Sequence, residues 1–154
     1  MEKYQTFGPR FVAAIVDGLI FLPLAVVNYF VIGLKPSPVM AQLWVLATTL
    51  LPLLYTIILH GLYGQTLGKM ATKVKVVSVN ENPITLHHAV LRSLPQIFFS
   101  FMMIFFSAAD GILLSLMTGA YFLWSILDII VFFVNDKRRA LHDLIAGTVV
   151  IKLK

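Results

Sequence analysis

The chain has 154 residues, of which 59% are hydrophobic and only 12% are charged. A soluble domain carries about 25% charged residues, so this composition excludes an ordinary soluble fold and is typical of an integral membrane protein. There are no cysteines, which excludes disulfides, thiolate zinc sites and cysteine nucleophiles. The basic residues behind the net charge of +5 flank apolar runs, so we expect lipid headgroups rather than nucleic acid as their counter-charge.

Four segments reach or approach the roughly 20 apolar residues that a helix needs to cross about 30 Å of hydrocarbon. We expect spans over residues 10–33, 39–60, 86–109 and 112–134, joined outside by short turns at 34–38 and around 107–115. The first apolar run is too long for a signal peptide, and no small-residue cleavage site follows it. We therefore expect it to be retained as a membrane span.

The basic residues also predict the orientation. With four spans, the N-terminus, the loop 61–85 and the tail 135–154 share one side of the membrane. That side carries eleven of the twelve lysines and arginines, and the other side has only Lys35. The positive-inside rule therefore predicts a multi-pass protein of the cell inner membrane with both termini in the cytoplasm.

The cytoplasmic segments contain two short strand patterns. Residues 74–79, VKVVSV, are rich in β-branched residues and precede the turn signal NENP, and residues 148–154, TVVIKLK, alternate polar and apolar. We expect the two strands to pair. Between them, Leu141, Leu144 and Ile145 share a helical face, which predicts a short interfacial helix with the neighbouring arginines at the headgroups. The predicted fold is a single all-α integral membrane domain over residues 1–154, with four transmembrane helices, this interfacial helix and a small cytoplasmic β element.

Charged residues interrupt three of the spans. Arg10 and Asp17 are two helical turns apart and share a face. Asp128 lies eight residues before Asp136 at the cytoplasmic end of the fourth span, about 12 Å inside it, and Arg92 enters from the same side. Intramembrane charge is costly and indicates either a cation or proton site, with Asp17 and Asp128 as exchangeable acceptors, or a structural ion-pair network that fixes helix register.

Other motifs favour neither a nucleotide site nor a metal site. GQTLGK differs from the phosphate-loop pattern, because Tyr63 stands where a glycine is needed and Met70 where a serine or threonine is needed. Its glycines instead indicate a turn between the second span and the strand. The four histidines lack metal-ligand spacing, and no serine, histidine and acid arrangement is visible. We expect no cofactor, no metal and no enzymatic activity.

Several segments together resemble the RDD family, which is named for one arginine and two aspartates. They are RFVAAIVD with Arg10 and Asp17, GQTLGK followed by a VKVV strand, PITLHHAVLR, and RRALHDLIAGTVV with Asp143. The resemblance runs from about Tyr4 to Ile151 and implies that Asp143 is the third signature residue. Some members of the family are regarded as transporters, with sodium–proton antiport proposed for at least one, and others as accessory domains of larger membrane proteins.

These observations lead us to expect a transport-related protein, in the sharpest version an exchanger of a monovalent cation for a proton. The residues expected to form the ion site or charge network are Arg10, Asp17, Arg92, Asp128 and Asp143. Because four helices enclose only a narrow seam, transport would favour a homodimer in the lipid bilayer. The alternative is a non-transporting scaffold or assembly factor that binds a partner through its cytoplasmic face.

Overall fold

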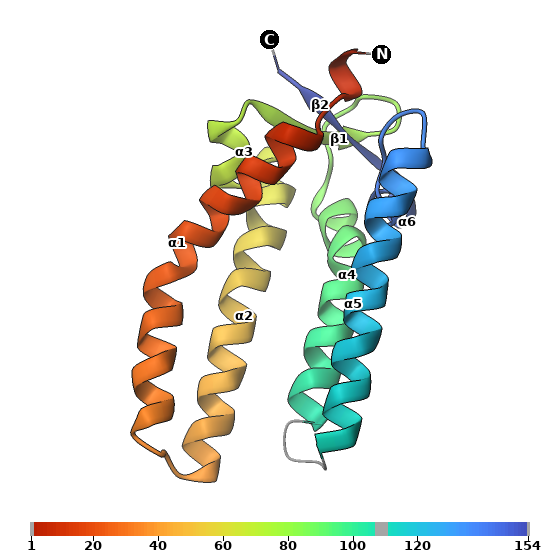
Figure 1. Ribbon diagram of the computed structural model, residues 1–154. Helices are drawn as coiled ribbons and strands as arrows, with labels where there is room; N and C mark the ends of the chain where they lie inside the picture. The colour runs from red at the N-terminus through yellow and green to blue at the C-terminus, as the bar shows by residue number, and fades with distance from the viewer. Residues whose placement is uncertain (1, 107–110, 154) are drawn as a thin grey trace.

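The computed structural model describes residues 2–106 and 111–153. Its four long helices run side by side and are α1 (Phe7–Gly33), α2 (Pro38–Tyr63), α4 (Leu86–Phe106) and α5 (Gly111–Val134) (Figure 1). Each is long and apolar enough to cross a membrane. The four predicted spans are therefore confirmed, although residues 107–109 of the third span and part of the turn predicted around 107–115 lie outside the described residues.

Local sequence signals explain where α2 begins and ends. Ser37 precedes the helix and accepts a hydrogen bond from the backbone N of Met40 at 3.4 Å, and Pro38 occupies the first helical position, where its missing N–H costs nothing. At the other end Gly64 has a φ of 71°, and its backbone N donates to the carbonyl of His60 at 2.9 Å. A left-handed glycine of this kind is a common helix stop.

The smaller elements gather at the end of the four helices where both termini lie (Figure 1). We call this assembly the cap, and it consists of η1 (Glu2–Tyr4), α3 (Leu67–Ala71), β1 (Val74–Ser78), α6 (Leu141–Ile145) and β2 (Thr148–Lys152). β1 and β2 pair antiparallel with Val76 opposite Val150, which confirms the predicted pairing. Both of these valines are fully buried and form a small core with Val74 and Ile84.

The short helix predicted over residues 141–145 is present as α6, with Leu144 and Ile145 exposed on it. Arg139, one of the arginines expected at the headgroups, makes contacts within the cap. Its Nε donates to the carbonyl of Thr148 at 2.8 Å and its Nη2 to the carbonyl of Asp143 at 3.2 Å. The guanidinium of Arg139 thus bridges a carbonyl of α6 and the first carbonyl of β2.

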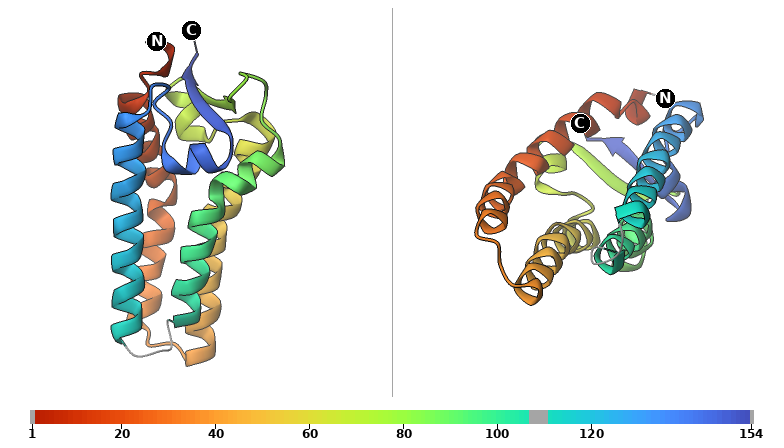
Figure 2. Two further views of the ribbon diagram at one scale, coloured as in Figure 1. Left: turned by 90° about the vertical axis from the view of Figure 1, so that its right-hand side faces the viewer. Right: turned by 60° about the horizontal axis from the view of Figure 1, so that its bottom comes forward.

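The long helices lie in an arc, with the cap across one end of it (Figure 2). Along this arc α1 packs against α2 and α3, α2 packs against α4, and α4 packs against α5. The two ends of the arc meet near the cap, where the ring of Phe7 on α1 lies 5.9 Å from that of Phe132 and 5.0 Å from that of Phe133 on α5. Residues near the cap therefore approach one another from all four helices.

Candidate functional site

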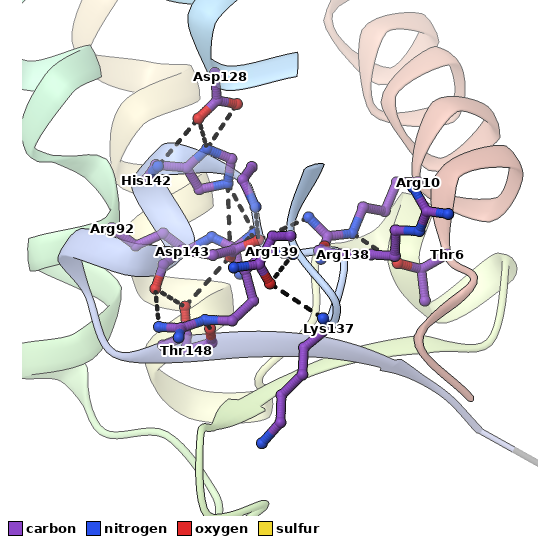
Figure 3. Close-up of polar contacts among 12 residues, drawn as sticks. Thr6, Arg10, Arg92, Asp128, Lys137, Arg138, Arg139, His142, Asp143 and Thr148 are labelled. Atoms are coloured by element: carbon purple, nitrogen blue, oxygen red, sulfur yellow. Dashed lines mark hydrogen bonds and ion pairs between the residues drawn. The ribbon is translucent and has the colours of Figure 1, made fainter. Parts of the chain in front are cut away.

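Asp143 lies fully buried in the cap between arginines from two different helices (Figure 3). Its Oδ2 is 2.8 Å from Arg10 Nη1 on α1, and its Oδ1 is 3.0 Å from Arg92 Nη2 on α4. The backbone N of Ala140 and the hydroxyl of Thr148 donate to it as well, at 3.2 and 3.3 Å. Burial opposes the charge, but Arg92 and then Arg10 hold the pKa of Asp143 well below its ordinary value, so the carboxylate is ionised.

Arg10 is held on the cap side by further contacts. Its Nε donates to the buried hydroxyl of Thr6 at 3.0 Å, and its Nη2 donates to the carbonyl of Arg138 at 3.3 Å. The guanidinium also lies 5.1 Å from the centre of the Phe132 ring. Arg10 thus extends toward the cap and pairs with Asp143. It does not pair with Asp17, although the two residues lie two turns apart on the same face of α1.

Asp17 has a separate set of partners. Its Oδ1 accepts hydrogen bonds from the Tyr55 hydroxyl at 2.7 Å and the Gly68 backbone N at 2.8 Å, and its Oδ2 accepts one from the Thr66 hydroxyl at 2.7 Å. A Cβ on Gly68 would collide with the carbonyl oxygen of Ala13 and lie 2.8 Å from Asp17 Cγ. The close approach of α3 to α1 therefore requires this glycine. Asp17 and the GQTLGK segment together attach α3 to α1.

Asp128 on α5 pairs with His142 on α6. The Nδ1 of His142 lies 2.8 and 3.0 Å from the two carboxylate oxygens, and its backbone N donates to Oδ1 at 3.0 Å. On the other side of the ring, Nε2 lies 3.0 Å from Arg92 Nη2 and 3.7 Å from Asp143 Oδ1. A neutral imidazole with its proton on Nδ1 fits these contacts, because it donates to Asp128 and accepts from Arg92. His142 thus links Asp128 to the buried ion pairs.

The structure therefore brings four of the five predicted site residues into one network and leaves Asp17 outside it. We call Arg10, Arg92, Asp128, His142 and Asp143 the charge network. Figure 3 shows it at the junction of the cap with α1, α4 and α5. The sequence did not indicate His142 as a member of this network. It lies 14 residues from its partner Asp128, and this separation is not a helical spacing that would predict a contact.

A cavity of about 390 Å³ lies beside the charge network, between α2, α4 and α5, and reaches α3 and α6. Its charged and titratable lining residues are His60, Lys69, Arg92, Tyr121, Asp128 and His142. Asp128 is the one carboxylate among the described residues that line it. The cavity therefore combines one acid with several basic groups at the depth where the charge network crosses the helices.

Lys69 and His60 form a pair on the cavity wall. The Nζ of Lys69 lies 2.7 Å from His60 Nε2, and the Nδ1 of the same ring lies 2.8 Å from the carbonyl oxygen of Thr56. The Nδ1 thus donates to the carbonyl and the Nε2 accepts from lysine. Burial, followed by the charges of Arg92 and Arg10, lowers the pKa of Lys69 well below its ordinary value. This pair was not predicted, because neither residue has a sequence partner at helical spacing.

The four spanning helices and the charges buried between them define a multi-pass integral membrane protein. Comparison with protein families matches residues 4–147 to the RDD family. Because this match covers nearly the whole chain, the protein belongs to the RDD family, and the resemblance seen in the sequence is confirmed. No curated protein and no solved structure matches the chain. Among residues 2–106 and 111–153, no group of three or more histidine or acidic side chains is placed to hold a metal ion.

Proposed function

We propose that the protein is transport-related and exchanges a monovalent cation for a proton at the cavity. The observation that supports this proposal best is the pair of Asp128 and His142 on the cavity wall, with His142 Nδ1 2.8 Å from Asp128 Oδ1. Histidine is the side chain that ordinarily changes its charge near neutral pH. A carboxylate paired with an imidazolium therefore loses the positive charge that compensates it when the imidazolium releases one proton.

Competition between the proton and the cation follows from this pairing. A proton held by the pair of Asp128 and His142 and a cation beside Asp128 would neutralise the same negative charge, so the two exclude each other. A unit charge about 4 Å from the carboxylate interacts with it by roughly 4 kcal/mol at an effective dielectric constant of 20, and this attraction must exceed the repulsion from Arg92 and Lys69, which line the same cavity.

The geometry favours Asp128 over Asp17 as the cation acceptor. Both oxygens of Asp17 already accept hydrogen bonds at 2.7–2.8 Å, and the residue does not line the cavity. A cation at Asp17 would have to displace Tyr55, Thr66 or Gly68 and detach α3. We therefore assign to Asp17 the role of holding α3 against α1.

The proposal includes the orientation and assembly expected from the sequence. Ten of the eleven lysines and arginines among the described residues lie on the side of the cap, which supports a cytoplasmic cap and an inner-membrane location. A homodimer would shelter the cavity side of the arc from lipid. Crosslinking in native membranes tests this assembly, and recovery of monomer alone would contradict it. We assign no enzymatic activity and no nucleic-acid partner.

Proteoliposomes loaded with a pH-sensitive dye test the exchange. Addition of sodium, potassium or lithium outside wild-type vesicles should move protons, and Asp128→Asn should abolish this movement while the protein stays inserted and folded. Asp136→Asn is the matched control, because this exposed carboxylate lies beyond the end of α5. If folded wild-type protein moves no protons with any of the three cations, the exchange is wrong and the scaffold hypothesis is preferred.

A further inference from the structure

We propose that the cavity binds a small organic ammonium ion, with its cationic nitrogen at Asp128 and its carbon chain against Tyr121 and Trp124. This inference deepens the proposed function, since it names a class of cation, and it rests on the same assignment of Asp128 as the cation acceptor. It does not depend on proton exchange. Three observations support it: an aromatic face beside the carboxylate, polar side chains without partners, and the balance of charge around the cavity.

The first observation concerns one face of α5. Tyr121, Trp124 and Asp128 are spaced i, i+3 and i+7, so they share a face of the helix, and all three line the cavity. Four residues separate Trp124 from Asp128, which is a rise of about 6 Å. A cation within about 6 Å of an indole ring is attracted by the electron-rich face of the ring. An ammonium group bound to the carboxylate would therefore lie within reach of Trp124.

The cavity is large enough for an organic cation. Its volume of about 390 Å³ corresponds to roughly 13 water molecules at ~30 Å³ each and falls within the ~300–1,000 Å³ of small-molecule pockets. A single metal cation would fill little of this space. Phe99 of α4 contacts both Tyr121 and Trp124, with ring centres 5.3 and 6.4 Å away, and so holds the aromatic wall in place. The volume beside this wall suits a short carbon chain.

The second observation concerns Ser93 and Gln96 of α4, which line the same cavity one turn apart. Ser93 is only 4% exposed, and neither its hydroxyl nor the Gln96 amide has a hydrogen-bond partner within residues 2–106 and 111–153. Polar groups inside a membrane-spanning helix need partners, and the oxygens of both side chains can accept from the N–H groups of an ammonium ion. Water can also fill this role, so the charge of Asp128 and the aromatic rings decide the class of ligand.

The third observation is the balance of charge around the cavity. Arg92 and Lys69 line it and repel a cation. Arg92, however, pairs with Asp143 at 3.0 Å, and burial lowers the pKa of Lys69 well below its ordinary value, which favours the neutral amine. When Lys69 is neutral, the remaining charged side chains of this region are three carboxylates and two arginines, namely Asp17, Asp128, Asp143, Arg10 and Arg92. A cation at Asp128 neutralises the one negative charge in excess.

Trp124 provides a reporter inside the cavity. The second tryptophan, Trp44, hydrogen-bonds to Asn28 at 2.8 Å and does not line the cavity, so Trp44→Phe leaves one fluorophore. The full-length Trp44→Phe protein in a neutral detergent at pH 7 is titrated with n-butylammonium chloride, which replaces sodium chloride at constant ionic strength. n-Butanol, which has the same chain without the charge, is titrated in parallel. We expect a saturable change in Trp124 fluorescence, with a half-saturating concentration at least about tenfold lower for n-butylammonium than for n-butanol.

Variants in the Trp44→Phe background test the binding residues. Asp128→Asn removes the charge and should weaken n-butylammonium binding at least about tenfold. Gln96→Leu removes one acceptor and should weaken it at least about threefold. This second variant keeps the test decisive if Asp128→Asn does not fold, because Gln96 makes no hydrogen bond within the described residues. Asp136→Asn and Gln42→Leu are the matched controls, since both residues are exposed and neither lines the cavity, and they should leave binding within about twofold of the parent protein.

The outcomes separate this inference from the proposed exchange. Absence of a saturable n-butylammonium response in the folded parent protein overturns the ammonium site, whether or not alkali cations drive proton flux. Binding without any flux refutes the exchange and leaves the ammonium site standing. Equal half-saturating concentrations of n-butanol and n-butylammonium, or unchanged binding in folded Asp128→Asn and Gln96→Leu, would also overturn the inference, because the cavity would then recognise only the carbon chain.

Discussion

Replacement of Asp143 by asparagine should destabilise the protein by about 3–5 kcal/mol, because it leaves two arginines in a buried site without their shared counter-charge. The structure gives a similar magnitude. Asp143 makes two ion pairs, at 2.8 Å to Arg10 and 3.0 Å to Arg92. Hydrogen bonds between charged groups contribute about 1.5–3 kcal/mol each, or roughly 3–6 kcal/mol together. Asparagine nearly preserves the shape of the side chain, so this loss reflects charge rather than packing.

Unfolding in mixed micelles measures this loss. Helical circular dichroism is followed as the fraction of a denaturing detergent rises, and Asp143→Asn is compared with wild type and with Asp136→Asn, an exposed control expected to change stability by less than about 0.5 kcal/mol. The triple variant Arg10→Met/Arg92→Met/Asp143→Leu should recover most of the lost stability. Removing all three charges together also removes the cost of burying them.

Two results would refute this reasoning. A loss below about 1 kcal/mol for Asp143→Asn would place the cluster among weak surface ion pairs, despite the complete burial of Asp143. A triple variant no more stable than Asp143→Asn would show that shape or hydrogen bonding, rather than uncompensated charge, determines the loss.

Three further predictions concern other parts of the molecule. Gly68→Ala should cost about 1–3 kcal/mol by overpacking against Ala13 and Asp17, more than the helix propensity of alanine returns, and the same unfolding assay measures it. Because the pKa of Asp143 is lower in the folded than in the unfolded protein, its stabilisation is complete above the unfolded pKa of ~3.9 and is lost as the pH falls below that value. The free energy of unfolding should therefore differ more between pH 5 and pH 3 in wild type than in Asp143→Asn. Lys75→Cys should be protected from a membrane-impermeant thiol reagent outside intact cells and labelled after lysis; labelling in intact cells would contradict a cytoplasmic cap.

The membrane spans and the sheet could be predicted because their signals are local. The length of each apolar run sets a span, and the alternation of residues 74–79 and 148–154 identifies two strands that need a partner. Depth within the helices also placed Arg92 and Asp128 correctly in one layer. Such estimates use only the rise per residue, which is nearly constant in a helix.

The partners of individual charges could not be predicted, because they depend on tertiary contacts. Arg10 and Asp17 share a face of α1, yet Arg10 pairs with Asp143, 133 residues away. Asp17 instead accepts from Thr66 and Gly68, in a segment whose sequence indicated only a turn. A long arginine side chain and a short aspartate side chain reach different neighbours even when their backbones lie on one face.

The wide sequence separation within the charge network has a consequence for biogenesis. The chain is synthesised from its N-terminus at ~5–20 residues per second, so Asp143 leaves the ribosome roughly 7–27 s after Arg10, which precedes it by 133 residues. Near the end of this interval all four spanning helices have been made, but both arginines still lack the carboxylate that they share. β1 likewise has no partner strand until residues 148–152 emerge. Asp143 and residues 148–152 thus complete both the ion pairs and the sheet after the spanning helices have been made, so a chain truncated before α6 should be inserted yet lack both, and such a chain would be exposed to membrane proteases.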